Sequence, residues 1–173
     1  MSTTNVLSLI LGQHKSLKES LFVLTSDTKG DIDKQKHLVK FINLLKMHTR
    51  AEEATIYEVL MEISPDKRLV LAAEEEHHLA NSIVRELESM NYQSDWTAEI
   101  EAKAKVLGEI VKLHIDQEEK SFFEVCRQTL TRLELEAIGE EFQLRCMEFD
   151  DKEHEITMSE RIDRINHDLG LVP

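Results

Sequence analysis

The chain has 173 residues, enough for one domain of ordinary size, and contains only 5 glycines and 2 prolines. The 41% hydrophobic content excludes a disordered chain. The few glycines and prolines and the 5% aromatic content disfavour an all-β fold, which would need more turn residues. The net charge of −13 argues against nucleic acid or an anionic membrane surface as a partner, because both would repel the protein.

Helical periodicity begins at about residue 4 and continues to residue 25, where a polar loop follows. A second helix is predicted over about 32–63. Ser64 and Pro65 then resemble an N-cap and a first-turn proline, which predicts that a third helix begins there and ends near residue 90. A fourth helix is predicted over about 96–127. Since short connections make consecutive helices antiparallel, we expect an all-α, up-down-up-down four-helix bundle.

A fifth helix is predicted after the bundle, because Thr131 and Glu134 have the spacing of a capping box. It should continue to about residue 169, with a break near 149–151. We therefore predict a bundle over residues 1–130 and a helical C-terminal extension over 131–173, which packs on the bundle or forms a homodimer contact.

The cellular compartment is predicted from two absences in the sequence. Cys126 and Cys146 lack CxxC spacing, which indicates reduced packing thiols rather than a metal site or a disulfide. No apolar run has the length of a membrane span, and the run near the N-terminus lacks the features of a signal peptide. We expect a soluble, cytoplasmic protein without membrane partners.

Four of the eight histidines lie on the apolar faces of the predicted bundle helices, one on each helix. They are His14, His48, His77 and His114. The third helix illustrates the argument, because His77 aligns with Val84, whereas the adjacent His78 aligns with Arg85. We therefore expect His77 to point into the core and His78 to be exposed.

Two glutamates lie on the same faces as two of these histidines. Glu52 follows His48 by four residues, and Glu118 follows His114 by four. A buried carboxylate without a partner costs several kcal/mol, and a metal ion resolves this conflict. Imidazole and carboxylate ligands suit iron or manganese, and the charge of two carboxylates and a bridging hydroxide fits two divalent ions better than one.

The sequence resembles the hemerythrin-like, histidine-rich cation-binding (HHE) family over about residues 4–127. The segments that carry the resemblance are Gln13-His14-Lys15, His48-Thr49-Arg50-Ala51-Glu52-Glu53, Glu76-His77 and His114-Ile115-Asp116-Gln117-Glu118-Glu119. The resemblance implies a four-helix bundle with two non-haem iron ions, ferrous or ferric, joined by an oxo or hydroxo bridge. By this analogy the four histidines are terminal ligands, and Glu52 and Glu118 bridge the metals. Independently of the analogy, we expect Glu53 and Glu119 to lie behind the ligands or on a solvated face rather than to bind metal directly.

The third helix departs from the oxygen-carrying members of that family, which have two histidines four residues apart there. At that spacing from His77 this chain has Ala73 and Asn81, and neither can replace an imidazole. About two coordination positions would then be open rather than one, which argues against reversible oxygen carriage. Glu74, about one turn before His77, could fill one of these open positions as an additional ligand.

These features predict a non-haem di-iron protein that binds or senses dioxygen, or the related small ligands nitric oxide and peroxide. Two alternatives remain at this point. One is a di-iron peroxidase, oxidase or iron-repair enzyme, which two open positions would favour. The other is iron storage or a metal-free helical interaction module.

Overall fold

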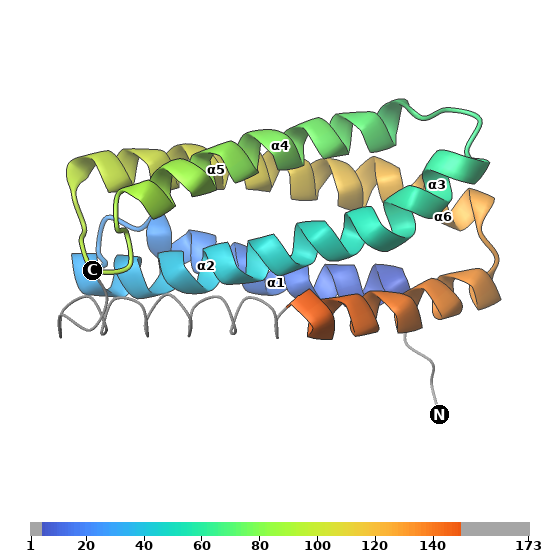
Figure 1. The fold of residues 1–173 in the computed structure, drawn as a ribbon, viewed down its shortest axis with the longest axis horizontal. Coiled ribbons are helices and arrows are strands. Elements are labelled where there is room, and N and C mark those ends of the chain that lie inside the picture. The colour runs from blue at the N-terminus through green and yellow to red at the C-terminus, as the bar shows by residue number, and fades with distance from the viewer. Residues whose placement is uncertain (1–4, 150–173) are drawn as a thin grey trace, which may run out of the picture.

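A computed structural model describes residues 5–149 of the chain, which form helices and contain no strand (Figure 1). No helix within this range is long and apolar enough to cross a membrane. The labelled elements are α1 (Val6–Leu24), α2 (Asp31–Glu52), η1 (Glu53–Tyr57), α3 (Glu58–Ile63), α4 (Arg68–Ser89), α5 (Ala98–Gln117), η2 (Glu118–Phe122) and α6 (Phe123–Thr129).

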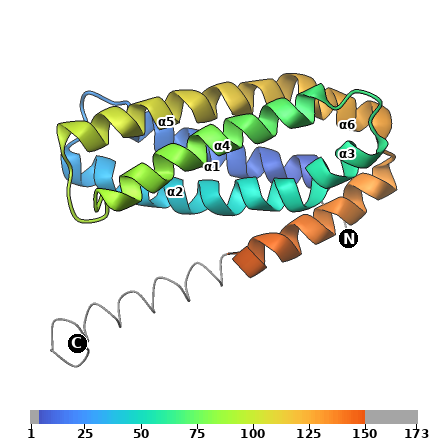
Figure 2. The same ribbon diagram turned by 45° about the horizontal axis from the view of Figure 1, so that its top comes forward.

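The four-helix bundle predicted from the sequence is confirmed. α2, η1 and α3 form one continuous helix, as do α5, η2 and α6, because the backbone stays helical at each junction. With α1 and α4 they make four antiparallel rods (Figures 1 and 2). η1 and η2 are single π-helical turns, which occur often at functional sites.

The start of the third bundle helix differs from the prediction. Helix α4 begins at Arg68, and residues 64–67 form a loop. The Ser64 hydroxyl accepts a hydrogen bond from the backbone N–H of Asp66, whose carboxylate accepts one from the N–H of Arg68. These local bonds compete with helix formation, so Ser64 closes a turn instead of capping the helix.

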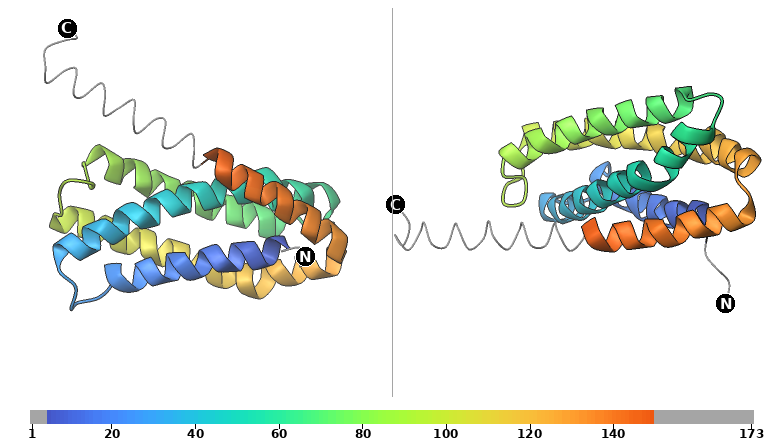
Figure 3. Two further views of the ribbon diagram at one scale, coloured as in Figure 1. Left: turned by 90° about the horizontal axis from the view of Figure 1, so that it is seen from below. Right: turned by 45° about the vertical axis from the view of Figure 1, so that its right-hand side comes forward.

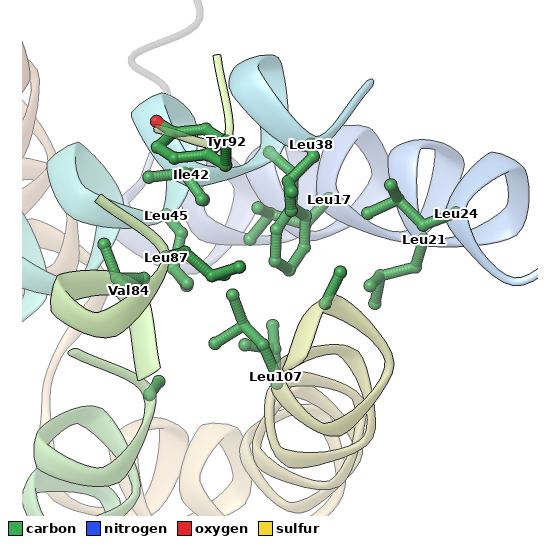
Figure 4. Close-up of a cluster of buried hydrophobic side chains, with 14 of the residues drawn as sticks. Leu17, Leu21, Leu24, Leu38, Ile42, Leu45, Val84, Leu87, Tyr92 and Leu107 are labelled. Carbon is green, nitrogen blue, oxygen red and sulfur yellow. The ribbon is translucent and has the colours of Figure 1, made fainter. Parts of the chain in front are cut away.

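The hydrophobic core consists of two clusters at opposite ends of the bundle. One is built around Leu17, Leu38, Leu45 and Leu107 (Figure 4). The other contains Ile10, Ala51, Tyr57, Ala73 and Phe122. The four histidines on the apolar faces lie between these clusters along their helices. A buried polar layer therefore divides the apolar core.

A further helix over residues 132–149 lies outside the four bundle helices, beside α1 and α2 (Figures 1 and 3). Its capping box is confirmed, because Glu134 accepts from the N–H of Thr131 at 2.7 Å and donates its own N–H to the Thr131 hydroxyl. Leu135 and Phe142 are buried in the second cluster. The predicted continuation of this helix lies outside the described residues.

Phe142 provides a test of this packing. We expect Phe142→Ala to lower the free energy of unfolding by about 3 kcal/mol or more, because it leaves a cavity beside the bundle. Leu144→Ala on the exposed face of the same helix should change it by less than about 0.5 kcal/mol. Chemical denaturation of both variants measures the difference, and equal losses would contradict the packing.

Candidate metal centre

The six residues predicted as ligands converge in the polar layer at the middle of the bundle. His14 and His48, from α1 and α2, are completely buried, and so is Glu52. The Nε2 atom of His48 lies 3.2 Å from Oε1 of Glu52, and that of His14 lies 3.2 Å from Oε2 of Glu118. The two helices that carry the HxxxE pairs thus bring their carboxylates together with the histidine of α1.

His77 and His114 complete the site from α4 and α5. Their Nε2 atoms are 3.2 Å apart, and each lies 3.5 Å from a carboxylate oxygen, of Glu52 for His77 and of Glu118 for His114. Two groups of potential ligand atoms result, and Glu52 belongs to both. The groups are His14, His48, Glu52 and Glu118, and Glu52, His77 and His114.

Each histidine is held from behind by a side chain of the neighbouring helix. The Nδ1–H of each ring donates to an oxygen atom at 2.8 to 3.1 Å. The pairs are His48 with Gln13, His77 with Glu53, His114 with Glu76 and His14 with Glu119. Because every acceptor comes from the preceding helix in the circuit α1, α2, α4, α5 and back to α1, the hydrogen bonds close a ring around the bundle.

This ring fixes what the inner face of the site can bind. With each Nδ1–H donated outward, a neutral imidazole presents the lone pair of its Nε2 atom to the centre. The carboxylate oxygens facing these lone pairs are acceptors too, and both oxygens of Glu52 and Oε2 of Glu118 have no hydrogen-bond partner. Acceptors that face only acceptors need a cation or protons between them, so the residues fit a metal centre.

The pKa values of the two carboxyl groups diverge. Burial, reinforced by the charge of Glu118, raises the pKa of Glu52 well above its usual range. Burial alone would also raise the pKa of Glu118, but the close imidazole groups of His114 and His14 hold it well below that range. Two carboxylates that share a buried site cannot both ionise without a cation, so one carries a proton when no metal is present.

The histidines respond to the same surroundings. Burial lowers the pKa of His48 and of His77. For His114 burial has the same effect, but the nearby carboxylates of Glu118 and Glu76 outweigh it and raise its pKa to about 9. Protons therefore take the place of a cation in the metal-free site, and metal ions would displace them.

The site is built from two matching halves. The first half comprises α1, α2 and η1, and the second comprises α4, α5 and η2. Counted from the histidines, the matching positions are Gln13 and Glu76, His14 and His77, His48 and His114, Glu52 and Glu118, Glu53 and Glu119, and Tyr57 and Phe123. Tyr57 stacks on His77 and Phe123 stacks on His14, so the aromatic packing follows the same pattern.

Tyr57 differs from its match, Phe123, by a hydroxyl group that faces the centre. This group donates a 2.6 Å hydrogen bond to Oε1 of Glu118. Burial and the charge of Glu118 raise the pKa of Tyr57 well above its usual range, which keeps the proton on the phenol. Tyr57 therefore fixes one oxygen of Glu118 and leaves the other free for a metal.

A buried layer of imidazoles and carboxylates inside a four-helix bundle defines a class of metal-binding helical proteins. The sequence matches the family described as Hemerythrin HHE cation binding domain over residues 5–126, and the chain belongs to this family. A search of curated proteins finds no match.

The fold is similar to the crystal structure of a hemerythrin HHE cation binding domain-containing protein from Mycobacterium kansasii. The two share 18% sequence identity with a TM-score of 0.69, over 86% of this chain and 89% of that chain. At this identity the likeness concerns the fold alone.

Several sequence predictions around the ligands can be compared with the structure. His78 is exposed, and Glu53 and Glu119 lie behind the histidines, both as predicted. Glu74 is half-buried and belongs to neither group of potential ligand atoms. Cys126 is a buried packing residue, and burial raises the pKa of its thiol to about 12.

The sequence did not predict the roles of Gln13, Glu76 and Tyr57. Gln13 and Glu76 each precede a histidine but bind the histidine of a different helix. The only signal was their adjacency to His14 and His77, which does not reveal a contact between helices.

Gln13 links the centre to the outer helix, because its amide nitrogen donates to the sulfur of Cys146 at 3.4 Å. We expect Gln13→Leu to weaken iron binding by about 10- to 100-fold, since the Nδ1–H of His48 loses its acceptor. Gln35→Leu is the matched control, because Gln35 donates to the carbonyl of Tyr92 far from the centre. Competition with a chelator measures the iron affinity of both variants. Similar affinities in the two variants would refute the role of Gln13.

Proposed function

We propose that the protein is a non-haem di-iron protein that binds or senses dioxygen, or the related ligands nitric oxide and peroxide. His14 and His48 would hold one iron ion, and His77 and His114 the other, with Glu52 and Glu118 between them. When bound, such a pair supplies reversible one-electron chemistry at iron and open positions for a small ligand.

One observation carries the proposal: the ligand atoms of all six residues face a common centre while their outer atoms are held. Within each of the two groups the potential ligand atoms lie within 4.8 Å of one another, and five of the inner atoms have no hydrogen-bond partner. Metal ligands arranged by surrounding hydrogen bonds in this way are typical of preorganised metal sites.

Charge balance supports two ions rather than one. Five carboxylates belong to the site, since Glu53, Glu76 and Glu119 lie behind the histidines in addition to the two inner glutamates. Lys18 forms an ion pair with Glu119 and offsets one of them. When all five are ionised, the remaining four negative charges equal the charge of two divalent cations.

The chain's own residues would perform three tasks around the metals. Gln13, Glu53, Glu76 and Glu119 orient the imidazoles. Tyr57 keeps its proton and holds one oxygen of Glu118. The apolar clusters on both sides exclude bulk water from the layer, which favours the binding of small, weakly polar ligands.

An enzymatic function is the second candidate, and the composition of α4 favours it. Ala73 and Asn81 lie four residues from His77, the spacing at which the oxygen carriers of this family have a second histidine. The iron pair would therefore retain more open coordination positions. This arrangement supports oxidase or peroxidase chemistry over carriage.

Iron content tests the proposal. Protein produced with iron should contain about two iron ions per chain and absorb in the near ultraviolet and visible range, as ferric pairs with nitrogen and oxygen ligands do. His77→Ala should lose iron and this absorbance, because His77 is buried at the centre, whereas the exposed neighbour His78→Ala should keep both. Full iron content in His77→Ala, or wild-type protein without iron, would contradict the assignment.

A mixing experiment separates carriage from sensing or catalysis. The reduced, iron-loaded protein is mixed with oxygenated buffer, followed by absorbance and then purged with argon. We expect the spectrum not to return to that of the reduced protein, because Ala73 and Asn81 supply no further ligand to His77's metal. Complete recovery after the purge would make carriage the better interpretation.

A further inference from the structure

A small cavity lies beside the centre in its second half. Its walls are formed by Leu69, Ala73, Glu76, Gln117, Glu118 and Phe122. The cavity is about 10 Å³, close to the space that one water molecule needs. Glu118 and Glu76 connect it to the centre, since Glu118 is one of the inner carboxylates and Glu76 holds His114.

The cavity lies on the side of Ala73 rather than of Asn81. Ala73 is buried one turn before His77 and belongs to the same core cluster as Tyr57 and Phe122. Asn81 is half-buried and does not line the cavity. The space that a histidine side chain would fill is therefore located at Ala73.

The first half of the site has a larger side chain at the position that matches Ala73. Ile10 matches Ala73, because each precedes the histidine of its helix by four residues. Ile10 is completely buried, and so are Ala51 and Ile56, which match Gln117 and Phe122. A polar, exposed residue therefore lines the second half where a buried alanine lines the first.

The outer helix increases this difference. Residues 132–149 lie beside α1 and α2 of the first half (Figure 3), where Cys146 contacts Gln13. Gln13 matches Glu76, which lines the cavity in the second half. The outer helix therefore contacts the first half at Gln13, whereas the matching residue of the second half, Glu76, lines the cavity.

We propose that the cavity at Ala73 is the access and docking position for the small ligand of the centre. Its apolar walls, Leu69, Ala73 and Phe122, suit a weakly polar molecule of one or two heavy atoms, such as dioxygen or nitric oxide. Its acidic lining disfavours small anions, and its size excludes organic substrates. This proposal rests on the proposed function and adds the route by which that ligand arrives.

Variants of opposite effect test the route, with nitric oxide as the probe. The reduced, iron-loaded protein is mixed with nitric oxide, and the rate of the absorbance change is measured. Ala73→Val should slow it by about 10-fold or more, because two added methyl groups fill the cavity. Leu69→Ala should accelerate it by widening the same space. Ala72→Val, an exposed neighbour on α4, is the matched control and should bind at the wild-type rate.

Iron content and the melting temperature of the metal-free protein are measured for every variant. We expect wild-type iron content throughout, which shows that the changes affect access and not the centre. Unchanged rates in both Ala73→Val and Leu69→Ala, with iron retained, would overturn the route while leaving the di-iron assignment intact. If Ala73→Val loses iron or stability, the test rests on Leu69→Ala. A wild-type rate of nitric oxide binding in Leu69→Ala would then refute the route. Wild-type protein without iron would instead refute the proposed function.

Discussion

The ring of hydrogen bonds behind the four histidines is the constraint on which the rest of the site depends. Each Nδ1–H is donated to the preceding helix in the circuit, so a neutral imidazole presents the lone pair of its Nε2 atom to the centre. Glu52 and Glu118 then face acceptors in a layer closed to water. In the metal-free layer, protons on these groups offset the repulsion between the acceptors, and burying these polar groups in an apolar core costs free energy. A bound cation would relieve this cost.

The two matching halves of the site share ligands but differ around them. Tyr57 carries a hydroxyl group where Phe123 has none, and it immobilises one oxygen of Glu118. Gln13 is neutral where Glu76 is acidic, and its amide can also donate to Cys146 on the outer helix. The hydroxyl of Tyr57 and the contact of Gln13 with the outer helix belong to the first half, whereas the cavity at Ala73 belongs to the second.

Sequence patterns predicted those parts of the structure that depend on one helix at a time. The apolar spacing around His77 separated it from His78, and the four-residue spacing placed Glu52 beside His48. Contacts between helices depend on their register and crossing, so the pairing of Gln13 with His48 was not predictable. The π turns and the loop at 64–67 also arise from local backbone hydrogen bonds that have no strong sequence signal. Ala73 was noted as a missing ligand, but only the packing around it reveals a cavity.

The same alanine connects the centre's coordination to its access. A histidine at this position would saturate one metal and fill the space between Leu69 and Phe122 in the same step. An alanine supplies no ligand atom and leaves the space beside it open, so under the proposed di-iron assignment a small molecule that enters the cavity would arrive beside a metal with an open position. Ile10 keeps the matching position of the first half closed, and the helix over 132–149 lies over it. The proposed access at Ala73 therefore requires no moving lid, because the cavity is already present beside the buried centre.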